Sequence, residues 1–391
     1  PSRFAEAKLG SLVRVAGLRM EPVCDTTWAV PARLSADGTP RTALLKFSII
    51  VAAYNVERYI GECLESLKAQ TFGDFECVVV NDCSQDGTLA AIESAVSGDA
   101  RFSVLTLPQN SGLSAARNAG IAVAQGEFLM FLDGDDYYVA DALQCLATRI
   151  DVDKLDMLYF GAASFYESRK LRREHYENQE VREHIEGVHS GPEMYVLMER
   201  TKAFRPSACL YTVRKQLLDD NGVRFLDGIL HEDVLFQMQL ISHPQRVAFL
   251  CEPLYQRRMR EGSIMTTRPT MRNVHGLTVT TQHMQEWLMA HAAEFSPDFC
   301  AAYAWRTADT REVAARYLLQ IDEEDVEAYR DGLEPTDLAA FDMHVLGLWR
   351  SMKHVYDEYE NSHAYRIGHA LIAIPQKIRR LVELPQAKPG E

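Results

Sequence analysis

The sequence of 391 residues has no C-x-x-C pair, no long apolar run and no excess of positive charge. Its eight cysteines are scattered along the chain, which excludes a zinc ribbon and a compact disulfide framework and is typical of core thiols in a reducing compartment. No apolar run approaches the roughly 18 to 20 residues that cross a bilayer, and no charged N-terminal segment precedes an apolar stretch. We therefore expect a cytoplasmic protein without a membrane-spanning helix.

Positive charge is also scarce. The chain has 41 Lys and Arg against 55 Asp and Glu, a formal net charge of −14. Such a chain repels a nucleic-acid backbone, so we expect no nucleic-acid partner. An anionic small substrate meets the same repulsion, and a site for one must therefore contain local arginines or a divalent cation.

With 47% hydrophobic and 25% charged residues, the composition is typical of a folded globular protein. From Phe47 onward, apolar β-branched segments alternate with amphipathic helical patterns. This alternation predicts an α/β fold: a mostly parallel sheet with helices on both faces, which binds ligands beyond the carboxyl ends of its strands. Strands are predicted at 47–53, 75–80, 102–107, 127–132 and 157–160, and helices near 60–68, 86–96 and 111–124 and from Asp141 onward.

Three domains follow from the pattern. Residues 1–46 have weak periodicity and are interpreted as an N-terminal extension, 47–266 as the α/β catalytic domain, and 267–391 as a mostly helical C-terminal domain. The charged stretch 166–186 is typical of a solvated face or a hairpin. The segment 365–384 mixes apolar and basic residues, which fits a peripheral contact with an anionic membrane surface or packing against the catalytic domain.

Polar side chains follow the first, second and fourth predicted strands, and a parallel sheet would bring them together. Tyr54 could stack on a nucleotide base and Asp82 could accept a hydrogen bond from a base or ribose, while the third group is Asp133-Gly134-Asp135-Asp136. Taken singly, these also fit a packing ring, a turn residue and a helix cap. Asp133 and Asp135 are two residues apart and share one side of an extended segment, which suits Mg²⁺ or Mn²⁺ with open positions for phosphate oxygens.

In this order, the motifs resemble those of the family 2 inverting glycosyltransferases, which have the GT-A fold. The resemblance covers residues 47 to about 266, in the motifs SIIVAAYNVERYIGECLESLKAQTF, FECVVVNDCSQDGT, NSGLSAARNAGI, GEFLMFLDGDD, LHEDVLF and RMREGSIMT. Two positions depart from the family pattern: Ala53 replaces the usual proline of the first motif, and Cys83 replaces the usual glycine of the second.

The resemblance implies a role for each motif residue. Asp135 would be the principal metal ligand and Asp133 would lie near the ribose and the metal, with Mn²⁺ or Mg²⁺ as the cofactor. Asp233 would be the base that takes the acceptor proton, and Glu232 would orient the acceptor or support the site. A helix N-terminus, where acidic residues are favoured, is the other explanation for this pair. The implied nucleotide-sugar-binding residues are Ala52, Tyr54, Glu57, Asp82, Arg117, Asp133, Arg260 and Ser263.

The expected function is metal-dependent transfer of a sugar, with inversion, from a nucleotide-sugar donor to a surface-polysaccharide or lipid-linked glycan. Uridine as the base and a bacterial cell-envelope setting come from the resemblance alone. Two alternatives remain: a sugar nucleotidyltransferase and a non-catalytic nucleotide-sugar binding module. His231-Glu232 could open a zinc-protease helix, but position 235 is leucine rather than the required histidine, which excludes that reading.

Overall fold

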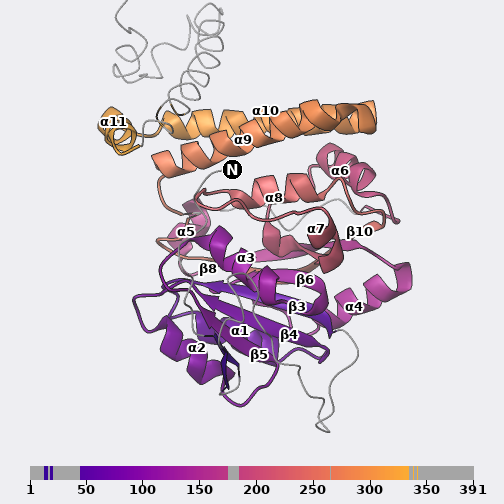
Figure 1. The fold of residues 1–391 in the computed structure, drawn as a ribbon, viewed down its shortest axis with the longest axis vertical. Helices are drawn as coiled ribbons and strands as arrows, with labels where there is room; N and C mark the ends of the chain where they lie inside the picture. Colours follow the sequence, from indigo (N-terminus) through magenta and orange to yellow (C-terminus); the bar gives the residue numbers. More distant parts are fainter. Residues whose placement is uncertain are drawn as a thin grey trace, which may run out of the picture. The chain divides into compact units, whose positions relative to one another are not determined.

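The computed structural model describes residues 13–15, 18–20, 45–174, 185–264, 266–333, 338 and 341. Within them the chain divides into two compact units. The first comprises the residues up to Thr267 together with Gln282–Arg306, and the second comprises Arg268–Thr281 and the residues from Thr307 onward. Figure 1 shows the elements of both units. The segment 365–384, predicted to contact a membrane or to pack on the catalytic domain, lies outside the described residues.

The first unit is built on one mixed sheet. Its described strands follow the order β2-β1-β5-β4-β3-β6-β9-β8-β10-β7. The strands are β1 (Val13–Val15), β2 (Leu18–Met20), β3 (Leu45–Ala53), β4 (Phe75–Asn81), β5 (Phe102–Thr106), β6 (Gly126–Asp133), β7 (Tyr137–Tyr138), β8 (Met157–Tyr166), β9 (Tyr211–Arg214) and β10 (Val247–Met259).

The centre of this sheet is parallel, as predicted. Strand β3 pairs with β4 on one side and with β6 on the other, and β4 pairs with β5. Nearly every residue of β3, β4 and β6 is buried, because helices cover both faces of a parallel sheet and leave neither face for water. The three strands therefore end at the same edge, with their polar successors beside one another.

Part of the sheet departs from the prediction. The short strand β9 lies antiparallel between β6 and β8, and β10 runs parallel to β8 with register shifts between Leu250 and Tyr255. The charged stretch predicted to be a solvated face or a hairpin contains a short helix at Arg169–Glu174, and residues 175–184 lie outside the described residues. Arg169, Lys170, Arg172 and Arg173 are exposed, which fits the prediction of a solvated face. Lysine and arginine have good helix propensity, so their charge alone did not indicate a helix.

A small residue allows one helix to pack closely on the sheet. Gly120 of α3 faces Ile50 of β3 so closely that a Cβ at position 120 would overlap the isoleucine side chain. The described helices of the first unit, or parts of them, are α1 (Ile60–Lys68), α2 (Thr88–Val96), α3 (Leu113–Val123), α4 (Ala142–Asp153), α5 (Arg169–Glu174), α6 (Gly191–Arg200), α7 (Lys215–Asp220), α8 (Glu232–Leu240), α9 (Met271–His291) and α10 (Pro297–Leu318).

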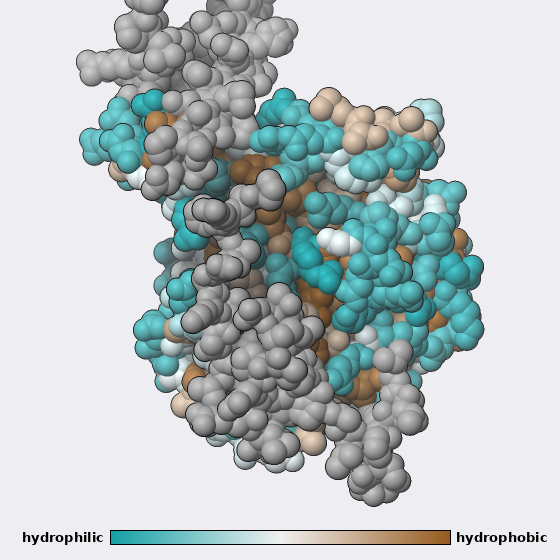
Figure 2. Space-filling model, in the orientation of Figure 1, coloured by the Kyte–Doolittle hydropathy of each residue, from teal (hydrophilic) through white to brown (hydrophobic). Residues whose placement is uncertain are grey.

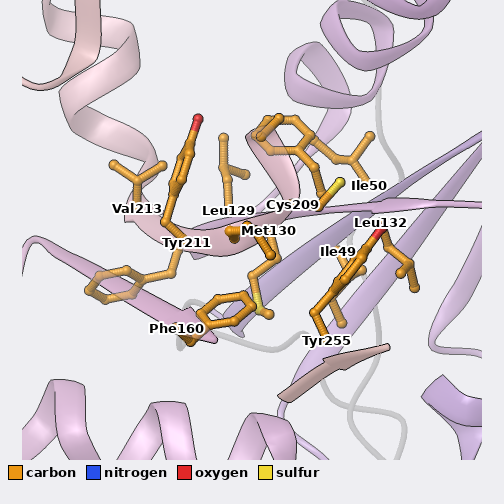
Figure 3. Packing of buried hydrophobic residues seen from close by; sticks show 14 of the residues in the cluster. Ile49, Ile50, Leu129, Met130, Leu132, Phe160, Cys209, Tyr211, Val213 and Tyr255 are labelled. Atoms are coloured by element: carbon orange, nitrogen blue, oxygen red, sulfur yellow. The ribbon is translucent and has the colours of Figure 1, made fainter. Parts of the chain in front are cut away.

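The core of the first unit is rich in aromatic side chains. Figure 3 shows Phe160, Tyr211 and Tyr255 packed against aliphatic residues of β3 and β6. A stacked pair, Phe225 and Phe236, has ring centroids 3.8 Å apart and joins the loop before α8 to the helix itself. Among the coloured residues in Figure 2, hydrophilic ones cover most of the surface and hydrophobic ones show between them.

In the second unit, the parts of α9 and α10 assigned to it meet a short helix, α11 (Glu323–Asp331). Its buried cluster includes Met271, Val274, Leu277 and Leu318. In the described parts of both units, no helix is both long and apolar enough to cross a membrane.

Candidate functional site

The site begins where three parallel strands end together. In the register of the sheet, Ala53 lies opposite Asn81 and Ala52 lies opposite Asp133. The Asp82 amide donates to the Ala53 carbonyl at 2.9 Å, and the Gly134 amide donates to the Ala52 carbonyl at 3.1 Å. The structure therefore places the polar groups after β3, β4 and β6 side by side, as the sequence predicted.

Two loops at this edge are bound to each other. Asn55, in the left-handed region at φ +52°, accepts from the Gln85 amide through Oδ1 at 2.9 Å. Glu57 accepts from the Gly87 amide through Oε2 at 2.9 Å. Tyr54, beside these contacts, is 45% exposed, which is unusual for a tyrosine directly after a buried strand. The cross-linked loops thus present an aromatic ring to solvent at the sheet edge.

Asp82 binds backbone rather than solvent. Its Oδ1 accepts from the Ser111 amide at 2.7 Å and its Oδ2 accepts from the Gly112 amide at 2.8 Å, just before α3 begins. Burial raises the pKa of Asp82, and the two backbone hydrogen bonds oppose that rise. The carboxylate therefore fixes the start of α3 at the end of β4.

Arg117 of α3 joins two carboxylates that are far apart in the sequence. The guanidinium is buried; Nη1 donates to Glu232 Oε1 at 2.7 Å and Nη2 donates to Asp133 Oδ1 at 2.9 Å. Burial alone would lower the pKa of Arg117, but Asp133 and Glu232 outweigh it and hold the arginine charged. The resemblance assigned this side chain to the nucleotide, whereas its hydrogen bonds here go to the two acidic motifs.

The acidic loop after β6 places its three carboxylates in different surroundings. Asp133 is partly exposed beside Arg117, and Asp135 Oδ2 accepts from Arg260 Nε at 2.7 Å. Asp136 is buried: Tyr255 donates its hydroxyl to Oδ2, and the Arg258 amide donates to Oδ1 at 2.6 Å. Burial raises the pKa of Asp136 well above its ordinary value, and Asp135 and Asp133 raise it further.

A divalent ion fits the chemistry of this loop. Among the described residues no group of three or more acidic, histidine or cysteine side chains could hold a metal by itself. Asp133 and Asp135 nevertheless supply hard oxygen donors. Burial raises the pKa of Asp135, Asp133 raises it further, and Arg260 opposes the rise. Mg²⁺ commonly binds through one or two carboxylates and completes its shell with substrate phosphates and water.

The second acidic pair starts helix α8. Glu232 is buried against Arg117, while the partly buried Asp233 accepts from the Val234 amide through Oδ1 at 2.9 Å. Within the described part of the chain, Asp233 Oδ2 has no hydrogen-bond partner. Burial raises the pKa of Asp233, and Arg117 opposes that rise. His231 stands before the helix with φ +64°, which turns the chain sharply into α8.

The arginine-containing segment after β10 lies against the acidic loop. Besides the Arg260 ion pair with Asp135, Arg258 Nε donates to the Asp135 carbonyl at 2.9 Å. Ser263 closes a turn, because its carbonyl accepts from the amides of Thr266 and Thr267 at 3.0 Å. Thr266 in turn donates its hydroxyl to the Arg260 carbonyl at 2.8 Å.

Two features of the site were missed by the sequence analysis. Asp136 and its partner Tyr255 were not assigned a role, although the run of three aspartates was noticed. Nothing in the local pattern indicates that a tyrosine 119 residues further on donates to Asp136. The bridge through Arg117 was also missed, because it joins α3 to α8 across 115 residues. A buried Glu needs a cationic partner, but only the structure shows that Glu232 is buried.

Comparisons with known proteins find similarity to glycosyltransferases. Residues 48–212 match the family model described as Glycosyl transferase family 2. The uncharacterized glycosyltransferase EpsJ of Bacillus subtilis is 33% identical over 230 residues, covering 56% of this chain and 62% of that protein. TarS of Staphylococcus aureus, a poly(ribitol-phosphate) beta-N-acetylglucosaminyltransferase, is 32% identical over 229 residues, covering 57% of this chain and 37% of TarS.

A solved structure shows the fold. Crystalline S. aureus TarS 1–349 in complex with UDP-GlcNAc aligns with a TM-score of 0.52 at 24% identity, over 75% of this chain and 77% of that one. The fold is therefore GT-A, an α/β sheet flanked by helices with a helical C-terminal region. The chain spans about three fifths of EpsJ and less than two fifths of TarS.

Proposed function

Because residues 48–212 match the Glycosyl transferase family 2 model, we propose that the protein transfers a sugar from a nucleotide-sugar donor to a glycan hydroxyl, with inversion at the anomeric carbon. One observation carries the proposal. Arg117 binds Asp133 of one acidic motif and Glu232 of the other, at 2.9 and 2.7 Å, so the two motifs flank one arginine. This contact supports a single site in which one acidic motif would bind the metal and the other would supply the base.

The donor would bind along the edge of the sheet. The exposed Tyr54 ring is available to stack on the base, and Asp82 is fixed beside it. Ala52 and Glu57 support this edge through backbone contacts: the Ala52 carbonyl holds Gly134 and the Glu57 carboxylate holds Gly87. Arg260 and Ser263 lie on the segment that contacts the acidic loop, where the diphosphate would lie.

The cofactor in this proposal is Mn²⁺ or Mg²⁺ at Asp135 and Asp133. When bound, such an ion stabilises the negative charge that develops on a departing diphosphate. Because no group of three or more possible ligands occurs among the described residues, we expect the ion to depend on oxygens of the donor, so metal and donor should bind together. A chain with a net charge of −14 repels an anionic substrate, and the metal would supply positive charge at the site.

Asp233 is the proposed base, with Glu232 as its neighbour. Glu232 is held by Arg117, whereas Asp233 keeps one oxygen without a partner among the described residues and can accept a proton. In the reaction, the acceptor hydroxyl gives its proton to Asp233 as its oxygen bonds to the anomeric carbon. The bond from that carbon to the diphosphate oxygen breaks, and its electron pair leaves on the nucleoside diphosphate.

The relatives suggest the substrate class. TarS acts, by its name, on poly(ribitol-phosphate) with N-acetylglucosamine, and EpsJ is likewise a glycosyltransferase. We infer a UDP-sugar donor and a cell-surface polysaccharide or lipid-linked glycan acceptor, which accords with a peripheral site of action at the inner face of the plasma membrane. A binding module would have no use for a base such as Asp233, and a nucleotidyltransferase would need a basic phosphate loop where Tyr54-Asn55-Val56-Glu57 stands.

The test is release of UDP from UDP-N-acetylglucosamine and from other UDP-sugars in the presence of Mn²⁺. We expect release that a chelator abolishes and that Mn²⁺ or Mg²⁺ restores. Asp233→Asn should bind UDP and Mn²⁺ as the wild type does but turn over about 10²- to 10⁴-fold more slowly, because only the proton acceptor is lost. Normal turnover by this variant refutes the assigned base, and release that resists a chelator refutes the metal.

A further inference from the structure

The expected metal ligand Asp135 already has a cationic partner within the protein. Arg260 Nε donates to Asp135 Oδ2 at 2.7 Å, and the two side chains are only 19% and 17% exposed. A charge-assisted hydrogen bond shielded from water to this degree is stronger than an exposed surface pair. Arg260 therefore supplies positive charge at the position where the proposed site needs a cation.

A metal ion and Arg260 compete for this carboxylate. A guanidinium bound to one oxygen neutralises the carboxylate and repels a dication that approaches the other oxygen. If the ion displaces Arg260, the partly buried guanidinium loses its partner, which is unfavourable. Metal alone should therefore bind weakly.

A donor diphosphate changes this balance, because phosphate oxygens are strong partners for arginine. The segment that carries Arg260 contains a glycine two residues further on. Gly262 has φ +76°, a conformation that glycine adopts without strain, and a Cβ there would meet nothing within 4 Å. The Tyr59 ring also contacts the Arg260 side chain, with its centroid 5.1 Å from the guanidinium carbon.

We propose that Arg260 is an internal counter-ion that makes metal binding depend on the donor. In the free protein it occupies Asp135, and when a nucleoside diphosphate binds it exchanges that carboxylate for the diphosphate, leaving Asp135 to the metal. This inference rests on the proposed function. It assigns to one side chain the coupling between metal and donor, a binding property that can be measured without turnover.

The experiment measures Mn²⁺ binding with and without UDP, by electron paramagnetic resonance of the free ion. In the wild type we expect UDP to tighten Mn²⁺ binding strongly. Arg260→Met should bind Mn²⁺ alone about tenfold more tightly than the wild type, and the tightening by UDP should fall by about the same factor or more. By linkage, the effect of Mn²⁺ on UDP affinity must fall equally.

Two further variants make the outcome decisive. Arg260→Lys keeps the charge and should bind Mn²⁺ alone as weakly as the wild type. Arg200→Gln removes one positive charge from an exposed pair with Asp298 and should change neither affinity. If Arg260→Met binds Mn²⁺ alone no more tightly than the wild type does, the counter-ion inference is wrong. If the wild type fails to bind Mn²⁺ even with UDP, the proposed function is wrong as well.

Discussion

At the scale of single residues, neighbouring carboxylates differ because their surroundings differ. Glu232 and Asp233 are adjacent at the start of α8, yet Glu232 is paired with Arg117 and Asp233 is not paired with any side chain among the described residues. Asp135 and Asp136 are likewise adjacent, but Asp136 is committed to Tyr255 and the Arg258 backbone. Adjacent carboxylates of one motif therefore have different partners: Glu232 is bound to Arg117 and Asp136 to Tyr255, whereas Asp135 is paired with Arg260.

The pH dependence of activity should reflect Asp233. Burial raises the pKa of this carboxyl above its usual value, with Asp133 adding to the rise and Arg117 and Arg257 opposing it. A base must be ionised, so kcat/KM should fall as the pH decreases through this raised pKa, at a higher pH than an exposed aspartate would give. A pH profile of UDP release at saturating Mn²⁺ measures it. An acid limb at or below the ordinary aspartate value would contradict the assignment.

The Arg117 bridge should be needed for stability as well as for activity. Arg117→Met leaves Glu232 buried without its cation, and removal of one partner from a buried pair costs about 3 to 5 kcal/mol. Urea unfolding measures this loss. The double variant Arg117→Met/Glu232→Gln should lose less than the sum of the two single variants, because the unpaired charge is gone. Additive losses would show that the two side chains do not interact.

At the scale of elements, α3 has to lie close to β3. Gly120 allows this approach, because a Cβ on residue 120 would overlap the Ile50 side chain. A Cβ on Gly61 of α1, in contrast, would have no other atom within 4 Å. Gly120→Ala should therefore destabilise the protein by about 1 to 3 kcal/mol through overpacking. Gly61→Ala should stabilise it by about 0.4 to 1 kcal/mol through the unfolded chain. The free energies of unfolding in urea compare the pair, and equal effects would contradict this account of the packing.

The strands show which elements could be predicted from the sequence and which could not. The central strands were predicted to within two residues, because a run such as FECVVV has the continuous apolar character of a buried parallel strand. The long strand β10 was missed: it contains Glu252, Pro253 and three polar residues from Gln256, and it forms through pairing with β8 rather than through its own pattern. The edge of the sheet was predictable because parallel strands end together.

The contacts between motifs were less predictable than the motifs themselves. Arg117, Asp135 and Arg260 were each chosen as site residues, but their partners were not. The ion pair between Arg260 and Asp135 depends on where β10 ends relative to the loop after β6, which is set by pairing far along the chain. Local pattern identifies which residues carry chemistry, and tertiary structure decides which of them neutralise one another.

At the scale of the whole molecule, every proposed site residue belongs to the first of the two compact units. A ligand that binds only the folded site stabilises it by about 2.7 kcal/mol when its concentration is a hundred times its Kd. UDP and Mn²⁺ together should therefore raise the unfolding temperature of the first unit by several degrees. Because metal and donor are proposed to bind together, Mn²⁺ alone should give only a small part of this rise.

Differential scanning calorimetry measures this shift, and a chelator added to the same sample should abolish it. If the two units unfold separately, the transition of the second unit should keep its temperature, since no proposed ligand contact lies within it. CMP with Mn²⁺ serves as the control, because CMP lacks both the diphosphate and the uracil base. It should raise the unfolding temperature no more than Mn²⁺ alone does. An equal shift with Mn²⁺ alone would mean that the ion binds without the donor, and the donor-dependent metal site would have to be abandoned.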